Sequence, residues 1–432
     1  MPEGIFYGMN MSSGMTVVLD PFLLENPNMV IVGMPGGGKS WFMKDLIEQY
    51  LLMGVRVYAI DIEDEYRRLC EDMGGVYLDM AMTAENKINV LDPDPEAPEG
   101  LSGAFQQFRG WMESVMLRKL DVQEIAVLDD AHRACFKAKG ITDEEPDSLR
   151  KKDIPLLSDL HAWLKKQKGE SAARMAAALQ PMAVGSERRA FNEHTTVNIR
   201  SNPFVVFGLK GVDRVMLPRR IKQIQIFTWN QMLKGLRRTV EIVDEAWFLL
   251  EHESTAEDLA ERARRFRKKN GMLVVASQQV ADFDSNRHAK AVIAMASTHL
   301  IFQQKPMVMG TIKDLFSLVE QEVSEIGALD QGEYLLKTAK LSMHMFKPSL
   351  PERWPLYTTK PEEVQQLNEA EARSTERAAK QAASNQGLGK GDSEDADKTR
   401  PDRHCWRKNP RRGKAKTKLK QMSRWRSARM RT

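Results

Sequence analysis

The chain has 432 residues, 42% of them hydrophobic, and a formal net charge of +5. This length allows two or three structural units, and no apolar run approaches the about 18 residues that cross a bilayer. The N-terminus lacks the basic-then-apolar pattern of a secretory signal. The three cysteines and eight histidines show neither disulfide nor metal-site spacing. We therefore expect a cytoplasmic protein without a transition metal.

The first strong pattern lies near the N-terminus, after a strand-like segment at Thr16–Leu19. Met29–Val32 is apolar, Gly33–Ser40 reads GMPGGGKS, and a helix-like segment follows at Trp41–Leu52. Strand, glycine-rich loop and helix in this order are typical of a phosphate-binding loop. Glycines let successive backbone N–H groups curl around phosphates at the positive end of a helix. We predict that the protein binds a nucleoside triphosphate.

This loop predicts individual contacts with the nucleotide and its metal. Lys39 would reach the β- and γ-phosphates, and Ser40 would ligate Mg²⁺ through its hydroxyl. The predicted nucleotide-binding residues are Gly33, Met34, Pro35, Gly36, Gly37, Gly38, Lys39, Ser40 and Trp41. The alternative is a glycine-rich turn that fits by coincidence, which the flanking strand and helix disfavour.

The next segments alternate between strand and helix character and then become helical. An apolar strand at Val55–Ile60 ends at Asp61, and another strand candidate lies at Gly75–Leu78. From about Glu96 to Arg189 the apolar residues follow a helical period. The expected helices are Phe105–Leu117, Ile125–Lys137, Ser158–Lys168 and Ala172–Val184. We interpret this block as a helical domain inserted into a sheet.

Strand patterns return after the helical block. The expected strands are Phe204–Leu209, Thr239–Val243, Met272–Ala276 and Leu300–Gln303. A helix is expected from about Pro218 to Lys234. Another begins near Ser254, where Ser254–Glu257 has a capping signature, and ends at Asn270-Gly271. The predicted fold is α/β, with a mostly parallel sheet flanked by helices and an inserted all-α domain.

Acidic and amide side chains follow two of these strands. Asp244 and Glu245 end the strand at Thr239–Val243, as in a Walker B strand. Asp244 would hold Mg²⁺ opposite Ser40, and Glu245 would polarise the water that attacks the γ-phosphate. Gln278 follows the next strand, where it would sense the γ-phosphate. An exposed acidic pair is the alternative for Asp244 and Glu245, but Glu245 favours hydrolysis over binding alone.

A cationic segment, Arg262–Lys269, lies between these two strands at the end of a helix. One interpretation is a solvated helix end, where cations interact favourably with the helix dipole. The other is an arginine finger that acts across a subunit boundary, with Arg265 and Arg267 as candidates. The sequence does not choose between these arginines.

Together, these motifs resemble the conjugative-transfer and type IV secretion ATPases of the TraC/TraE type, in the FtsK–HerA group of RecA-like motors. The resemblance extends over about Gly4 to Trp354. It is carried by Gly33–Ser40, Asp61–Tyr66 (DIEDEY), Ile88-Asn89, Pro155–Leu160, Phe191-Asn192, Val243–Trp247 (VDEAW), Ala276–Gln278 and Gly332–Leu336 (GEYLL). The order of so many motifs is more specific than any one of them.

The resemblance implies a RecA-like P-loop core in two parts, residues 1–95 and 196–357, around an all-α domain at 96–195. ATP and Mg²⁺ are the implied cofactors, with Lys39 and Ser40 at the nucleotide and metal, Asp244 and Glu245 in hydrolysis, and Gln278 in sensing. The implied assembly is a homo-hexamer that contacts other secretion or conjugation channel subunits at the inner face of the membrane.

The leading functional hypothesis is an ATP-hydrolysing motor that powers channel assembly or substrate translocation in conjugation or type IV secretion. The alternatives are a coupling-type DNA translocase and a nucleotide-dependent scaffold. Whether DNA, protein or both are moved stays open. Such ATPases usually carry a long N-terminal docking domain, whereas the loop here begins after 32 residues. A fragment, a split gene product and a motor with a separate docking subunit are all compatible with this.

The last segment, residues 358–432, is expected to be a helical stub that passes into a disordered basic tail. Residues 398–432 contain 15 Lys or Arg and one acid, Asp402, whereas the preceding residues contain 49 basic and 58 acidic side chains. Trp406 and Trp425 among these arginines would suit contact with DNA or an anionic membrane surface. An off-frame or unselected terminus has a similar composition, so both interpretations stay open.

Overall fold

The computed structural model describes residues 4–81, 85–96, 99–150, 153–197, 199–233, 235, 237–251, 253–360, 362–370 and 372–373. The predicted basic tail at 398–432 lies outside the described residues. The chain up to Leu367 forms one compact unit. Among the described residues, no helix combines the length and apolar character needed to span a membrane.

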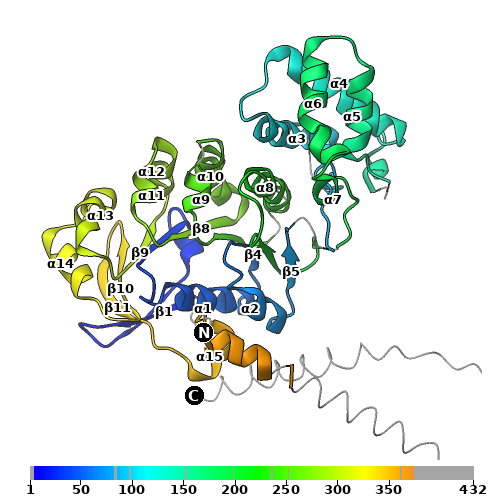
Figure 1. Ribbon diagram of the computed structural model, residues 1–432. Helices are drawn as coiled ribbons and strands as arrows, with labels where there is room; N and C mark the ends of the chain where they lie inside the picture. The colour runs from blue at the N-terminus through cyan, green and yellow to red at the C-terminus, as the bar shows by residue number, and fades with distance from the viewer. Residues whose placement is uncertain are drawn as a thin grey trace, which may run out of the picture. The chain divides into compact units, whose positions relative to one another are not determined.

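An eleven-stranded sheet organises this unit, in the order β2-β1-β11-β10-β9-β3-β8-β7-β4-β6-β5 (Figure 1). The strands are β1 Ile5–Asn10, β2 Thr16–Leu19, β3 Met29–Val32, β4 Arg56–Asp61, β5 Val76–Asp79, β6 Phe204–Gly208, β7 Thr239–Val243, β8 Gly271–Ser277, β9 Thr298–Phe302, β10 Glu333–Thr338 and β11 Ser342–Phe346. The strands from β9 to β5 are parallel, and the other four form an antiparallel edge. The predicted mostly parallel sheet is confirmed.

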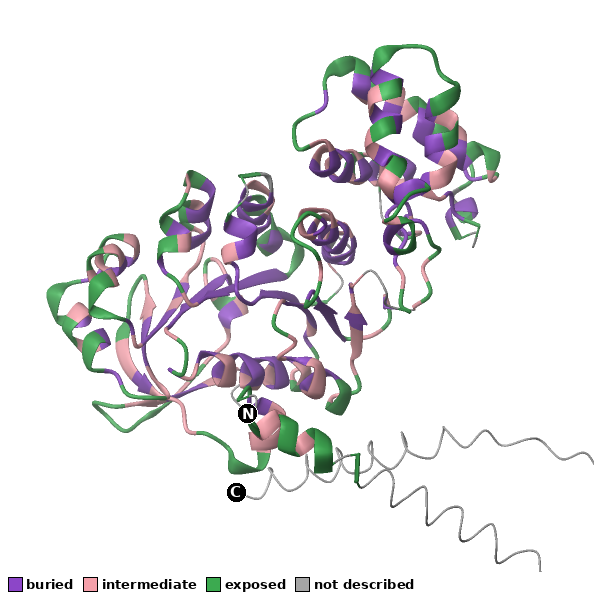
Figure 2. Ribbon diagram, viewed as in Figure 1, coloured by how far each residue is buried: buried purple, intermediate pink, exposed green. Residues whose placement is uncertain are grey.

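Helices cover both faces of the parallel strands (Figure 1). On one face lie α1 Lys39–Leu52, α2 Arg67–Asp72 and α15 Trp354–Tyr357. On the other lie α8 Leu217–Leu233, α9 Trp247–Leu250, α10 Glu253–Arg265, α11 Ala281–Asp284, α12 Arg287–Ala294, α13 Met309–Phe316 and α14 Glu320–Ala328. In β3, Met29 and Ile31 join the core on the α1 face, while Val30 and Val32 join the opposite core. Burial on both faces explains the nearly continuous apolar sequences of β3 and β8 (Figure 2).

The helical block between β5 and β6 has a hydrophobic core of its own. Its helices are α3 Gly100–Met116, α4 Val122–Ala138, α5 Leu157–Lys166, α6 Glu170–Ala183 and α7 Arg188–Phe191. Trp111, Leu128, Leu160 and Leu179 are completely buried in this third core. The indole N–H of Trp111 donates a hydrogen bond to the Arg219 carbonyl of α8, at 3.2 Å. The domain boundaries given above remain a prediction.

Two features differ from the sequence expectations. Strands β1, β10 and β11 were not predicted, because the apolar runs in these antiparallel strands are short and are interrupted by polar residues or glycine. The helix expected to begin near Ser254 begins one residue earlier, at Glu253. Differences of one residue at a helix end are ordinary, whereas the missed strands depend on tertiary packing.

The cationic segment at the end of α10 divides into one buried and several exposed side chains. Arg262 is only 5% exposed and donates hydrogen bonds to Glu241 Oε2 at 2.7 Å and Thr228 Oγ1 at 3.0 Å. Glu241 is completely buried in β7. Arg265 is exposed and pairs with Glu261, one helical turn earlier, at 2.7 Å. Arg262 is therefore a structural residue that joins α10 to the sheet.

We expect the substitution Arg262→Met to lower the free energy of unfolding by on the order of 3–5 kcal/mol, because it leaves the Glu241 carboxylate buried without its counterion. Urea denaturation of the full chain measures this change. Arg265→Met is the matched control, and loss of its exposed ion pair should cost less than about 1 kcal/mol. Equal small effects of both substitutions would contradict the structural role of Arg262.

Candidate nucleotide-binding site

The glycine-rich loop connects the C-terminal end of β3 to α1, and several of its glycines are required sterically. Gly36 and Gly38 have φ angles of 85° and 106°, in the left-handed region that favours glycine. A Cβ on Gly33 would lie 2.6 Å from Phe302 Cβ, and one on Gly38 would lie 3.2 Å from the Gly332 nitrogen. The Gly332 N–H also donates to the Gly37 carbonyl at 3.0 Å. The loop is thus packed closely against β9 and the segment that precedes β10.

The start of α1 provides backbone donors for an anion. Gly38 is the N-cap residue and supplies no side-chain cap. The N–H groups of Lys39, Ser40 and Trp41 belong to the first helical turn and have no partner within an α-helix. Such donors at the positive end of a helix bind phosphate. The loop therefore fits the phosphate chain of a nucleotide.

Lys39 lies at the centre of the site and is only 4% exposed. Its Nζ atom donates to Asp244 Oδ1 at 2.9 Å and to Glu245 Oε1 at 2.5 Å. Burial alone would lower the pKa of Lys39, but the charges of Asp244 and Glu245 and their hydrogen bonds raise it above its ordinary value. Lys39 is therefore a charged ammonium shared by two carboxylates.

Asp244 is buried and is oriented on both of its oxygens. Tyr66 donates its phenolic O–H to Asp244 Oδ2 at 2.6 Å, while Oδ1 accepts from Lys39 and from the backbone N–H of Glu245. Burial by itself would raise the pKa of Asp244, yet the charge of Lys39 and the hydrogen bond from Tyr66 lower it. The side chain is thus an ionised carboxylate, as an oxygen ligand for Mg²⁺ must be.

Glu245 follows in an uncommon backbone conformation, with a φ of 54°. This left-handed conformation costs free energy in a residue with a side chain and persists only where the surroundings hold it. Here Glu245 Oε1 accepts hydrogen bonds from Lys39 and from Gln278 Nε2, the latter at 2.7 Å. The structure therefore brings four predicted site residues together, namely Lys39, Asp244, Glu245 and Gln278.

Three other predicted residues lie differently. The Trp41 ring packs edge-on against Tyr357 at 5.1 Å, so only its backbone N–H faces the phosphate position. Arg265 and Arg267 precede β8, whereas Gln278 follows it. At about 3.3 Å per residue, the seven residues of β8 separate these two ends by roughly 20 Å. Neither arginine reaches the site of its own chain, and a role at a neighbouring subunit's site stays a prediction.

The segment after β4 contains site residues to which the sequence analysis gave no role. Asp61, at the end of β4, accepts hydrogen bonds from the backbone N–H groups of Glu65 and Tyr66, at 3.1 and 3.0 Å. These bonds fix the turn that carries the Tyr66 hydroxyl to Asp244. The signal in the sequence was Asp61 itself, because a carboxylate at the end of a parallel strand lies at the same edge as the phosphate loop.

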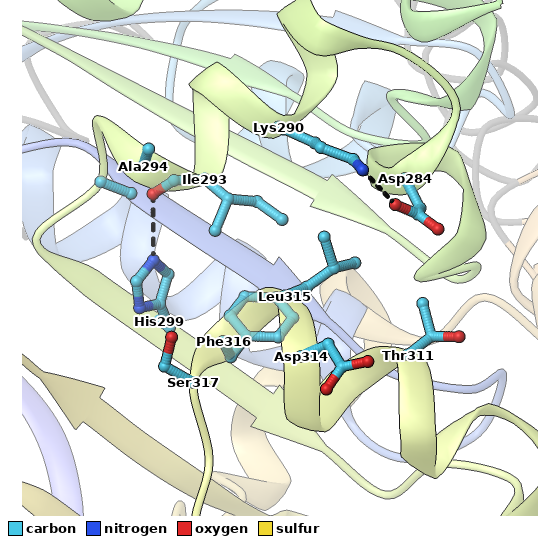
Figure 3. A pocket seen from close by; sticks show the side chains of 11 residues that line it. Asp284, Lys290, Ile293, Ala294, His299, Thr311, Asp314, Leu315, Phe316 and Ser317 are labelled. Carbon is cyan, nitrogen blue, oxygen red and sulfur yellow. Dashed lines mark hydrogen bonds and ion pairs between the residues drawn. The ribbon is translucent and has the colours of Figure 1, made fainter.

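A cavity on another part of the sheet edge lies away from these residues. It has a volume of about 650 Å³ and is bounded by α12, the start of β9 and α13 (Figure 3). Lys290 pairs with Asp284 on one side of it, and His299 Nε2 contacts the Ile293 carbonyl on the other. His299 is paired in register with Val30, before the end of β3. None of the predicted site residues lines this cavity, so the site is identified by its chemistry and not by cavity size.

Comparison with known families gives one domain match that covers most of the chain. The model of the TraG P-loop domain matches residues 16–91 and 162–386. Protein TraC of Escherichia coli K12 is 28% identical over 284 residues, which are 62% of this chain and 31% of that protein. The type IV secretion system protein virB4 of Bartonella henselae is 25% identical over 131 residues, or 28% of this chain and 16% of that protein. The chain thus spans less than a third of the length of these relatives.

Comparison with solved structures supports the same assignment of fold. VirB4 of Thermoanaerobacter pseudethanolicus superposes with a TM-score of 0.70 and 28% identity, over 82% of this chain and 98% of that chain. The plasmid coupling protein TrwB in complex with ADP and Mg²⁺ superposes with a TM-score of 0.51 and 14% identity, over 78% of this chain and 88% of that chain. The second likeness concerns the fold alone. The RecA-like P-loop fold expected from the sequence is confirmed.

We expect Asp61 to make stability depend on pH, because burial raises its pKa from 3.8 to about 7. The unfolded chain releases this proton near pH 4 and the folded chain near pH 7. The contribution of protonated Asp61 to the free energy of unfolding is therefore full below about pH 4 and is lost as the pH rises through about 7. Between pH 5 and 8 the free energy of unfolding of the wild type should fall by on the order of 2 kcal/mol more than that of Asp61→Asn, whose amide does not titrate. Urea denaturation of both proteins at the two pH values measures this, and equal losses would contradict the raised pKa.

Proposed function

This chain belongs to the TraG P-loop domain family, and we propose that it is an ATP-hydrolysing motor of a conjugative DNA transfer or type IV secretion apparatus. The observation that carries the proposal is the convergence of Lys39, Asp244, Glu245 and Gln278 beside the phosphate loop. The likeness to TraC and VirB4 supports the cellular setting. As further parts of the proposal, the motor is a homo-hexamer and works with other channel subunits at the inner face of the membrane.

The site residues divide the work of hydrolysis between them. Ser40 and Asp244 would hold Mg²⁺, which when bound neutralises charge on the phosphate oxygens. The Lys39 ammonium would turn from the two carboxylates toward the β- and γ-phosphates. Glu245 is then free to accept a hydrogen bond from the attacking water and to polarise it. Gln278 keeps the Glu245 carboxylate oriented through its amide, 2.7 Å away.

Two alternatives remain as competing proposals. A coupling-type DNA translocase would share this fold, and the likeness to TrwB extends only to the fold. A nucleotide-dependent scaffold would bind ATP without significant turnover. The hydrogen-bonded pair of Glu245 and Gln278 favours hydrolysis, because a scaffold has no use for a carboxylate held beside the phosphate loop in a strained backbone conformation.

We expect Glu245→Gln to bind ATP while its hydrolysis slows by on the order of 10² or more, because the amide cannot polarise the water. Lys39→Ala should abolish turnover, since the phosphate charge is left uncompensated. Steady-state phosphate release and nucleotide binding, measured on both variants, test these roles. Glu251→Gln, an exposed substitution after the same strand, is the control. Loss of binding in Glu245→Gln, or near-wild-type turnover in Lys39→Ala, would contradict the assignment.

We also expect the exposed arginines to act between subunits, because Arg265 and Arg267 lie about 20 Å from the site of their own chain. The ATPase activity of the full chain should be measured for Arg265→Ala and for Arg267→Ala alone. Each variant should then be mixed with Lys39→Ala subunits and measured again. Partial rescue of ATPase activity in one mixture identifies the finger. In that mixture the Lys39→Ala subunit supplies the arginine, and the arginine variant supplies the intact nucleotide site. Arg133→Ala, an exposed substitution in the helical block, is the control. Additive loss, or full activity of an unassembled wild-type monomer, would rule out an arginine finger.

A further inference from the structure

The turn between β4 and α2 contains a second acidic side chain close to the nucleotide site. Glu65 lies in this turn between Asp61, which accepts from the Glu65 backbone N–H at 3.1 Å, and Tyr66, whose hydroxyl donates to Asp244. Ser40, the predicted Mg²⁺ ligand, and Lys39 are among the nearby groups that stabilise the charge of the Glu65 carboxylate. Its Oε2 atom is buried and has no hydrogen-bond partner. A buried carboxylate oxygen without a donor is costly, because its lost hydration is not replaced. This oxygen is therefore suited to a donor that arrives with a ligand.

A buried lysine on α1 compensates the charge of Glu65. Lys44 is completely buried, and its Nζ atom donates to the Tyr357 carbonyl at 3.0 Å. Burial raises the pKa of Glu65, whereas the positive charge of Lys44 opposes this shift. Lys44 thus allows an acidic side chain to occupy this position beside Ser40.

Most oxygens of the neighbouring carboxylates accept hydrogen bonds from protein donors. Asp61 uses both oxygens for backbone N–H groups, and Asp244 Oδ2 accepts from Tyr66. Asp244 Oδ1 becomes available to Mg²⁺ only when Lys39 turns to the phosphates. Mg²⁺ in phosphate-transfer sites is held by one or two protein ligands plus phosphates, and it keeps several waters that need acceptors. Glu65 Oε2, which is buried without a hydrogen-bond partner, is free to be such an acceptor.

We propose that Glu65 is a second acidic residue of the Mg²⁺ site beside Asp244, where Oε2 accepts a hydrogen bond from a metal-bound water and the carboxylate keeps the Ser40 hydroxyl oriented. The inference rests on the proposed nucleotide site but concerns the affinity for the metal. Glu65 is a positioning residue in this assignment, because it acts through a water and through Ser40. Substitution of such partners of a metal site typically costs 10–100-fold in metal affinity.

The test measures binding of a fluorescent ADP analogue to the full chain, in EDTA and across a series of Mg²⁺ concentrations. In the wild type, Mg²⁺ should tighten the binding of the analogue. In Glu65→Gln, the affinity in EDTA should stay within about twofold of wild type. The Mg²⁺ concentration that gives half of the Mg²⁺-dependent increase in affinity for the analogue should rise by about 10-fold or more. Binding of Mn²⁺ with ADP, followed by electron paramagnetic resonance, should weaken in parallel.

Two further variants separate positioning from charge and from folding. Glu65→Asp keeps the negative charge beside Lys44 but withdraws the carboxylate by one methylene, so it should lose Mg²⁺ affinity as Glu65→Gln does. Glu63→Gln removes an exposed acid from the same turn and should behave like the wild type. Thermal unfolding of each variant establishes that the protein measured is folded.

Three results would overturn the assignment of Glu65. These are an unchanged Mg²⁺ dependence in Glu65→Gln, an equal loss of affinity with and without Mg²⁺, and full wild-type behaviour of Glu65→Asp. A wild-type chain that binds no nucleotide at all would instead refute the proposed function. The two failures are therefore distinguishable in the same titrations.

Discussion

The ion-pair network in which Lys39 is shared by Asp244 and Glu245 is the constraint on which the rest of the site depends. Lys39 is more than 200 residues away in the chain from both carboxylates. They meet because β3 and β7 are parallel strands separated only by β8, so their carboxyl ends lie at one edge of the sheet. Burial makes the pairing obligatory, since any one of these charges would be expensive alone. Gln278, Tyr66 and the left-handed backbone of Glu245 all serve to fix this network.

Much of this arrangement could be predicted from the sequence, for identifiable reasons. Strands such as Met29–Val32 are covered on both faces, so their apolar runs are continuous and their ends coincide with the residues expected. The loop glycines are required by positive φ angles and by close contact with Phe302 and Gly332, and they therefore form a readable motif. The order of strands in the sheet then brings Asp244, Glu245 and Gln278 to Lys39 without further information.

The rest was not predictable because it depends on tertiary contacts that leave no local signal. Tyr66 and Asp244 are 178 residues apart, and nothing near Tyr66 indicates its partner. Arg262 and Arg265 look alike in the sequence, yet one is buried against Glu241 and the other is exposed beside Glu261. The antiparallel strands β1, β10 and β11 are partly exposed and have mixed composition, so packing and not sequence period determines them.

The backbone hydrogen bond from Gly332 to Gly37 links the phosphate loop to the antiparallel part of the sheet. Gly332 leads directly into β10, and its carbonyl accepts from Lys347, just after β11. A backbone contact of this kind cannot be broken by a side-chain rotation, so the loop and this hairpin are constrained to move as one mechanical element. The antiparallel edge is thus joined to the phosphate loop through main-chain atoms, so side-chain substitutions on this hairpin that preserve its backbone leave the link intact.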